Sequence, residues 1–235
     1  FVTPNVLLAQ ARLMIGVTPT YINISNGAYL VVGDATASAA PNTITRDDAG
    51  GWIISEGNGT VNNRVKWYIG DAAAASTYTV PLGFGATNYI PLTYTVGASG
   101  TAGGAFVFSS YRTSTCTNSS NLPTTGTNPP VNYYSSAIPG DASVYGVDRF
   151  WEIDATSYGA SKPDLSGLKF TYVDGATSEV GTLTCANSIT ESDLQAQRWD
   201  FNAATPGWDG GNFLKGTGDG TANAVTLTGA AIVSG

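Results

Sequence analysis

Apolar and polar residues alternate with a period of two along most of the chain, whereas a helical period never extends beyond a turn or two. Residues 89–96 show this alternation most clearly. Leu92, Tyr94 and Val96 are separated by threonines, so one face is expected to be buried and the other covered with hydroxyl groups. Pro91 in the same segment indicates an edge position or a bulge. The pattern predicts an all-β protein.

The dipeptide Asn26-Gly27 is the strongest turn signal in the sequence, because both residues tolerate positive φ. Strand-like residues 21–25 and 28–32 flank it, and we expect them to pair as a tight hairpin. Further short strands bounded by Gly, Asn, Asp or Pro are expected over residues 51–56, 64–69, 78–82, 105–112, 148–154, 168–173, 183–185, 194–199, 224–227 and 230–233.

The chain divides into four segments by composition. Residues 1–19 form an N-terminal arm, residues 20–112 a first β half, and residues 148–235 a second β half. Residues 113–147 are rich in Ser, Thr, Asn and Pro and read as a long loop or as a boundary between the halves. About a dozen short strands without covering helices predict antiparallel sheets packed as a sandwich or jelly roll.

Charged residues make up only 11% of the chain, so its solubility must depend on hydroxyl and amide groups. A surface with few ions loses little hydration when it packs against another copy, which favours close assembly. The net charge of -7 repels nucleic-acid phosphates and anionic lipid. Nucleic acid is therefore excluded as an expected partner.

Histidine is absent, and the two cysteines do not form a metal-binding or thioredoxin-like motif. Catalytic triads and histidine-based zinc sites are thereby excluded. Cys116 and Cys185 are expected to form a disulfide that ties the two halves into one unit, and two buried thiols are the alternative. A disulfide suits an extracellular protein.

The apolar stretch over residues 6–15 is interrupted by Gln10 and Arg12, and is too short and polar to span a bilayer. We expect no membrane insertion. Because the chain begins at Phe1, we expect a mature, secreted protein from which a signal peptide has been removed.

The N-terminal arm is the leading candidate for a functional segment. It carries apolar residues that favour β structure: Val6, Leu7, Leu8, Leu13 and Ile15. The arm is the first strand of its own sandwich or a donor strand added to a neighbouring subunit, with a disordered segment as the remaining alternative. Head-to-tail strand addition does not close into a ring, and it would give a filament.

Five tryptophans could provide a platform for stacking on sugars. Trp52, Trp67 and Trp151 lie within apolar strand segments and are expected in the core. Trp208 lies between glycines and an aspartate, so it is the candidate glycan contact.

Acidic residues recur beside glycine in turns, but their spacing matches no known calcium loop. We expect no cofactor or metal, with calcium as the alternative. Four glutamates are the candidate carboxylates of a glycosidase: Glu56, Glu152, Glu179 and Glu191. Their separations cannot be read from the sequence.

Charged residues near one another on strand segments are expected to pair across strands and to protect sheet edges. The sets concerned are Arg64 with Lys66, Arg149 with Glu152, and Arg198 with Asp200.

Several segments together resemble uncharacterised secreted β-sandwich surface proteins of the Bacteroidota. The similarity extends from about residue 21 to residue 208 and is carried by residues 26–32, 50–57, 63–70, 78–83, 148–155 and 194–200. The resemblance implies export and a β-sandwich, and it transfers no catalytic residue. Many members look like type IX secretion cargo with a C-terminal sorting domain, and we expect this protein to be without that domain.

These observations favour an extracellular structural subunit, not an enzyme, that assembles with copies of itself into a fibre or surface layer by strand exchange. A monomeric carbohydrate-binding or adhesive module is the alternative. An exported hydrolase is the weakest of the three hypotheses.

Overall fold

The computed structural model describes residues 12–16, 20–36, 38–47, 50–56, 63–70, 75–97, 100–112, 146–156, 158, 162–163, 165–174, 179–180, 189–200, 207–208 and 216–232. For residues 199–200, 207–208 and 229–232 it describes the backbone alone. The regular elements are strands and one 3-10 turn, η3 (Glu191–Asp193). The strands are β1 (Leu13–Ile15), β2 (Tyr21–Asn23), β3 (Tyr29–Val32), β4 (Ile44–Arg46), β5 (Trp52–Ile54), β6 (Arg64–Tyr68), β7 (Thr77–Val80), β8 (Gly83–Phe84), β9 (Asn88–Tyr89), β10 (Leu92–Val96), β11 (Ala105–Arg112), β12 (Arg149–Thr156), β13 (Leu165–Thr171), β14 (Trp199–Asp200), β15 (Gly207–Trp208), β16 (Thr217–Asp219) and β17 (Ala224–Ile232).

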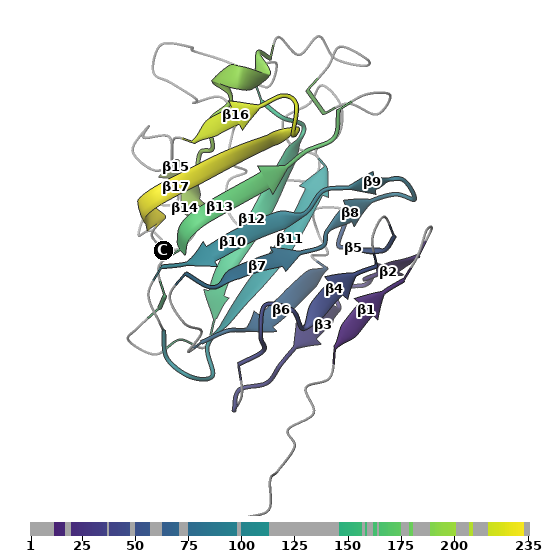
Figure 1. The fold of residues 1–235 in the computed structure, drawn as a ribbon, viewed down its shortest axis with the longest axis vertical. Coiled ribbons are helices and arrows are strands. Elements are labelled where there is room, and N and C mark those ends of the chain that lie inside the picture. The colour runs from purple at the N-terminus through teal and green to yellow at the C-terminus, as the bar shows by residue number, and fades with distance from the viewer. Residues whose placement is uncertain are drawn as a thin grey trace, which may run out of the picture.

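Two sheets make up the body of the molecule (Figure 1). One has five strands in the order β16-β17-β13-β10-β7, and all of its pairs are antiparallel. The other has four strands in the order β12-β11-β6-β3, and it is antiparallel except where β3 joins β6 in parallel. The predicted all-β class with antiparallel sheets packed as a sandwich is confirmed.

Both sheets contain strands from the two halves of the sequence. In the five-stranded sheet, β10 of the first half pairs with β13 of the second, and Leu92 lies opposite Phe170. In the four-stranded sheet, β11 pairs with β12 along its whole length. The halves thus share one core.

Aromatic side chains from the two sheets meet in that core. The ring of Tyr94 stacks on Tyr78 with 5.0 Å between centroids and on Phe108 with 4.7 Å. Trp67 meets Tyr78 edge to face at 5.3 Å. All four side chains are buried. Tyr78 and Tyr94 come from the five-stranded sheet and Phe108 and Trp67 from the other, so these contacts fasten the sheets together.

The alternation predicted for β10 is present. Leu92, Tyr94 and Val96 are buried, and the intervening threonines lie on the opposite face. Thr95 pairs there with Thr77, with 3.0 Å between hydroxyl oxygens.

Of the edge position and the bulge expected from Pro91, the edge position is wrong, whereas the register of β10 with β13 is irregular between Thr95 and Val96. β10 is an interior strand between β13 and β7. Pro91 stands immediately before its first residue, Leu92, where the missing N–H removes no hydrogen bond from the ladder.

The hairpin expected around Asn26-Gly27 is also wrong, although its turn forms. Asn26 and Gly27 have φ of 58° and 73°, and the N–H of Ala28 donates to the carbonyl oxygen of Ser25 at 3.1 Å. The flanking strands do not pair with each other, because β2 pairs with β5 and β3 with β6. The Asn-Gly dipeptide determines the position of the turn, whereas packing against distant segments determines which strands pair with β2 and β3.

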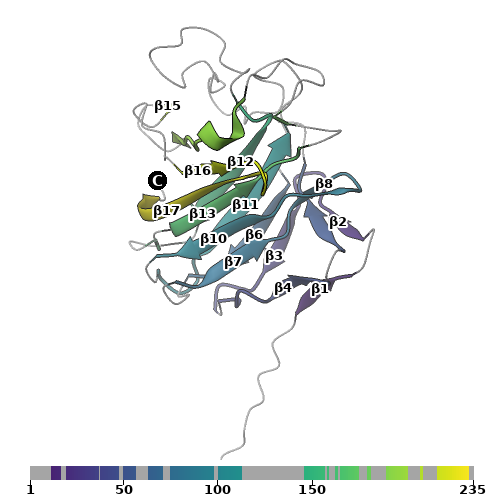
Figure 2. The same ribbon diagram turned by 45° about the horizontal axis from the view of Figure 1, so that its top comes forward.

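The first three strands all lie in parallel beside a later part of the chain: β1 beside β4, β2 beside β5, and β3 beside β6. Each is the end strand of its sheet. Figures 1 and 2 show these purple and blue strands together at one side of the molecule. We call β1, β2 and β3 the outer ribbon. The sequence did not predict β4, β8, β15 or β16.

Candidate functional site

The residues singled out from the sequence fall into three groups. Val6, Leu7, Leu8, Cys116 and Cys185 lie outside the described residues. The backbone of Trp208 belongs to β15, where it lies opposite Trp199 of β14. Leu13 and Ile15 belong to β1 and pair with β4 of their own chain, which is the intramolecular alternative for this part of the arm.

In β3, alternate residues direct their backbone N–H and C=O groups toward β6, and the residues between them direct theirs toward an open edge. The N–H of Arg64 donates to the carbonyl oxygen of Ala28 at 3.1 Å, and Leu30 lies in register with Val65. In a parallel ladder this phase directs the backbone groups of alternate residues, here 28, 30 and 32, toward β6. The N–H and C=O groups of Tyr29 and Val31 therefore point away from the sheet.

The other two strands of the outer ribbon have the same phase. In β1, the N–H of Leu13 donates to Thr43 at 2.8 Å and the carbonyl of Ile15 accepts from Asp47 at 3.1 Å. The backbone groups of Met14, between them, point outward.

In β2 the N–H of Trp52 donates to Thr20 at 3.3 Å, and the N–H of Ile24 donates to Ile54 at 3.0 Å. Residues 20, 22 and 24 are thus directed toward β5, and the backbone of Tyr21 points outward.

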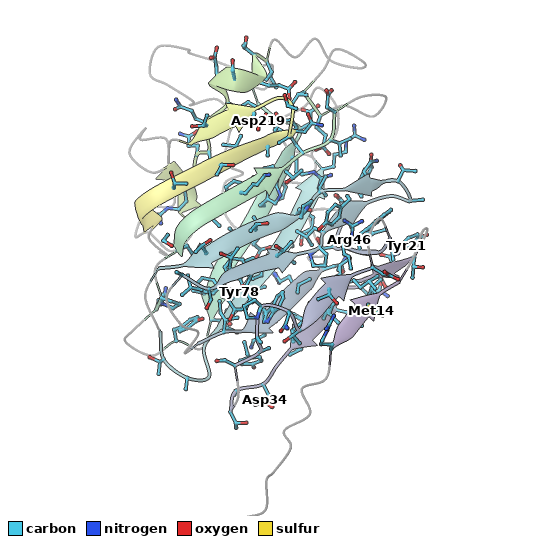
Figure 3. All side chains as sticks on the ribbon, viewed as in Figure 1. Met14, Tyr21, Asp34, Arg46, Tyr78 and Asp219 are labelled. Atoms are coloured by element: carbon cyan, nitrogen blue, oxygen red, sulfur yellow. The ribbon has the colours of Figure 1, made fainter. Side chains whose placement is uncertain are left out.

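The same alternate residues expose apolar side chains. Among the described residues the exposed large hydrophobic side chains are Met14 (61%), Tyr21 (44%), Tyr29 (48%) and Val31 (52%). Met14 and Tyr21 are labelled at this edge in Figure 3. The outer ribbon therefore combines unpaired backbone groups with exposed apolar surface, which is the chemistry of a strand-binding edge.

Asn63 holds the outer ribbon to the sandwich at the Asn26-Gly27 turn. Its side-chain oxygen accepts from the N–H of Gly27 at 2.9 Å, and its side-chain nitrogen donates to the carbonyl oxygen of Glu56 at 3.0 Å. The Asn63 residue is 4% exposed. These buried hydrogen bonds fix where β3 begins.

A second chemically distinct site is a buried ion cluster between the sheets. Arg149 at the start of β12 donates to Glu179 at 2.7 Å and 3.0 Å, and also to Ser110 of β11 at 3.1 Å. Glu179 is fully buried and also accepts from the N–H of Val173 at 3.0 Å. Glu56, which follows β5, forms a second ion pair with Arg149.

The cluster is balanced in charge. Arg112 lies opposite Arg149 in the β11–β12 ladder, an arrangement of like charges that is unfavourable unless anions offset it. Glu179 lies near both guanidinium groups, and Glu56 accepts from the N–H of Arg112 at 2.8 Å. Burial by itself would lower the pKa of Arg149, but the attraction of Glu179 and Glu56 outweighs it and raises that pKa.

The carboxylates considered for glycosidase chemistry all have partners within the chain. Glu56 and Glu179 are held by Arg149. Glu152 of β12 pairs with Arg64 of β6 at 2.7 Å, so these two charges pair across strands as expected.

Glu191 accepts from the hydroxyl of Tyr172 at 2.6 Å. Burial, together with this carboxylate, raises the pKa of Tyr172. We infer that these ion pairs and hydrogen bonds link segments of the fold.

Two of the tryptophans expected in the core are there. Trp52 and Trp67 are buried, and the ring of Trp52 stacks on Tyr21 at 6.5 Å. Trp151 is half-buried and packs against Phe170 at 4.9 Å.

The described residues contain no cluster of three or more His, Cys, Asp or Glu side chains that could hold a metal ion. Within the same part of the chain, no helix has the length and apolar character needed to cross a membrane.

The fold and the outer ribbon together define a β-sandwich protein with an open, apolar strand edge. Comparison of the chain with protein-family models, curated proteins and solved structures gives no match.

Sequence reasoning missed both sites. Tyr29 and Val31 were assigned to a hairpin with residues 21–25, and no local pattern indicated that β3 would become the end strand of a sheet. The one available signal for the ion cluster was the scarcity of charge, because an arginine such as Arg149 within an apolar strand needs a buried partner.

Proposed function

We propose that this protein is an extracellular structural subunit that assembles with copies of itself into a fibre or surface layer by β-strand addition. The observation that carries the proposal is the outer ribbon. Its outward backbone groups are unpaired among the described residues, and its exposed side chains are apolar.

An open edge of this composition favours association. An added strand supplies partners for the outward N–H and C=O groups and covers apolar side chains in the same step. Proteins that stay monomeric commonly protect such edges with lysine, proline or bulges. Met14, Tyr21, Tyr29 and Val31 offer none of these protections.

The composition supports assembly outside the cell. With 11% charged residues, few ions lose hydration when two copies pack together. A strand donated from one copy to the edge of the next is a heterologous contact, which extends into a filament unless the rotation closes. The role proposed is non-catalytic and requires no cofactor.

The test is size-exclusion chromatography with electron microscopy on the full chain and on a chain beginning at Arg12. This truncation keeps β1, whose Ile15 is 3% exposed and belongs to the core. We expect fibres or sheets from the full chain, and a folded monomer from the shorter one. Identical stable monomers from both would contradict the proposal.

Carbohydrate binding is the second candidate function. It is favoured by the backbone pairing of β14 with β15, which sets Trp199 opposite Trp208. Glycan-array binding that is lost in Trp208→Ala, with assembly unchanged, is the result expected for this function. Retained binding in Trp208→Ala would count against Trp208 as the contact.

A further inference from the structure

We propose that the open edge of β3 is the acceptor site for the N-terminal residues of a second copy, with residues 5–9 as the added strand. This inference rests on the proposed function and specifies which edge and which segment make the contact.

β3 differs from the other end strands of the two main sheets. Tyr29 and Val31 direct both backbone groups away from β6 and are about half exposed. At the remaining edges, β12 carries the charged Glu152 and Asp154, β16 carries Asp219, and β7 carries threonines. Charged edges resist an incoming strand because the charges must be desolvated.

Tyr29 is also held in place on this edge. The guanidinium of Arg64 donates to the Tyr29 hydroxyl at 3.1 Å and lies 5.8 Å from the centre of its ring. Arg64 is itself fixed by Glu152. An incoming strand therefore meets an aromatic side chain that has already lost part of its freedom, which lowers the entropy cost of binding.

The chemistry of residues 1–11 matches that of the edge. This stretch contains no Asp, Glu, Lys or Arg, and its apolar run Val6, Leu7, Leu8 favours strand structure. Val6 and Leu8, two residues apart, would share one face of an added strand and could cover Tyr29 and Val31. Five residues span about 16 Å as a strand, enough to cover the four residues of β3 at about 13 Å. Pro4 precedes this segment and removes no donor from it.

The first experiment locates the contact. A photoreactive benzoylphenylalanine replaces Leu7, and the labelled chain is mixed with an isotope-labelled chain before irradiation and mass spectrometry. We expect cross-links between chains that map to residues 29–32. Cross-links to β7, β12 or β16 of the partner, or within one chain, would overturn the assignment of β3 even if fibres form.

The second experiment measures affinity. A synthetic peptide of residues 1–11 is titrated into the chain that begins at Arg12, and into its Val31→Lys and Thr77→Lys variants. Thr77 is the matched control, since it is an exposed residue of the edge strand β7. Both substituted side chains are exposed, so both variants should stay folded.

We expect Val31→Lys to weaken peptide binding by about tenfold or more, because an ammonium group must then be desolvated at the edge. Thr77→Lys should leave the affinity within about twofold. Equal effects of the two variants would overturn the β3 assignment and leave assembly intact. Absence of both peptide binding and fibres would instead contradict the proposed function.

Discussion

At the scale of single residues, the centre of the core contains a hydroxyl group that lacks a partner. Tyr94 is fully buried between Tyr78 and Phe108, and its oxygen has no hydrogen bond within the described residues. Burial raises the pKa of Tyr94 well above its ordinary value, and the neighbouring Tyr78 and Tyr158 add to the effect. The ring of Tyr94 contributes packing contacts, whereas its buried hydroxyl lowers the free energy of unfolding because it has lost its hydration without gaining a hydrogen bond.

Removal of this hydroxyl should therefore stabilise the protein. We expect Tyr94→Phe to raise the free energy of unfolding by about 1 kcal/mol, measured by urea denaturation. The matched control is Tyr111→Phe, since the Tyr111 hydroxyl donates to Asn63 at 3.2 Å. Its loss should lower the free energy of unfolding by about 1 kcal/mol. A loss of stability in both variants would show that the Tyr94 hydroxyl has a partner.

The buried tyrosines also predict a sensitivity to alkaline pH. Burial raises the pKa of Tyr111 to about 12 in the folded protein, against about 10 when unfolded. Between these values the unfolded chain ionises while the folded protein does not. The contribution of Tyr111 to stability is thus complete below about pH 10 and is lost as the pH rises toward 12.

Urea denaturation at intervals from pH 9 to pH 11.5 measures this loss. The free energy of unfolding should fall above about pH 10, and less steeply in Tyr111→Phe. The same slope in wild type and variant would rule out Tyr111 as a source of the effect.

At the scale of elements, the buried ion cluster joins strands that are distant in sequence. Glu179 connects the start of β12, through Arg149, to the end of β13, through Val173. Glu56 adds the segment after β5. Each charge has partners, and that is the condition under which a buried ion pair is tolerated.

Breaking this cluster should be far more damaging than breaking the pair of Arg64 with Glu152. We expect Glu179→Gln to lower the free energy of unfolding by about 3 kcal/mol, because a charge on Arg149 is left under-compensated in the interior. Glu152→Gln, in the partly exposed pair with Arg64, should lower it by about 1 kcal/mol or less. Thermal and urea denaturation of the two variants make the comparison, and equal losses would contradict this account.

At the scale of the whole molecule, the two halves of the sequence are interleaved. β11 lies between β6 of the first half and β12 of the second, and β10 lies between β7 and β13 in the same way. Neither half contains all the strands of either main sheet.

Separate halves are therefore expected not to fold. Fragments 1–112 and 113–235, expressed alone, should show no cooperative thermal unfolding by circular dichroism, whereas their mixture should regain it. The intact chain is the control. Cooperative unfolding of fragment 1–112 alone would show that the first half is an independent domain.

The sequence by itself determined the period of the structure and the position of its bends. The alternation of Leu92, Tyr94 and Val96 with threonines specified a half-buried strand because side chains alternate across any strand. Asn26 and Gly27 specified a tight turn because both accept positive φ. These are local steric properties, and they do not depend on residues that are distant in the sequence.

Only the tertiary structure decided which strands are neighbours and which groups remain unpaired. The turn at Asn26-Gly27 joins strands that pair with β5 and β6, because the apolar face of each strand is buried best against those later segments. Arg149 pairs with Glu179, 30 residues away, and with Glu56. The open edge at Tyr29 and Val31 exists because β3 is the end strand of its sheet and pairs there with β6 alone. Such pairings depend on contacts between distant segments, and no local pattern encodes them.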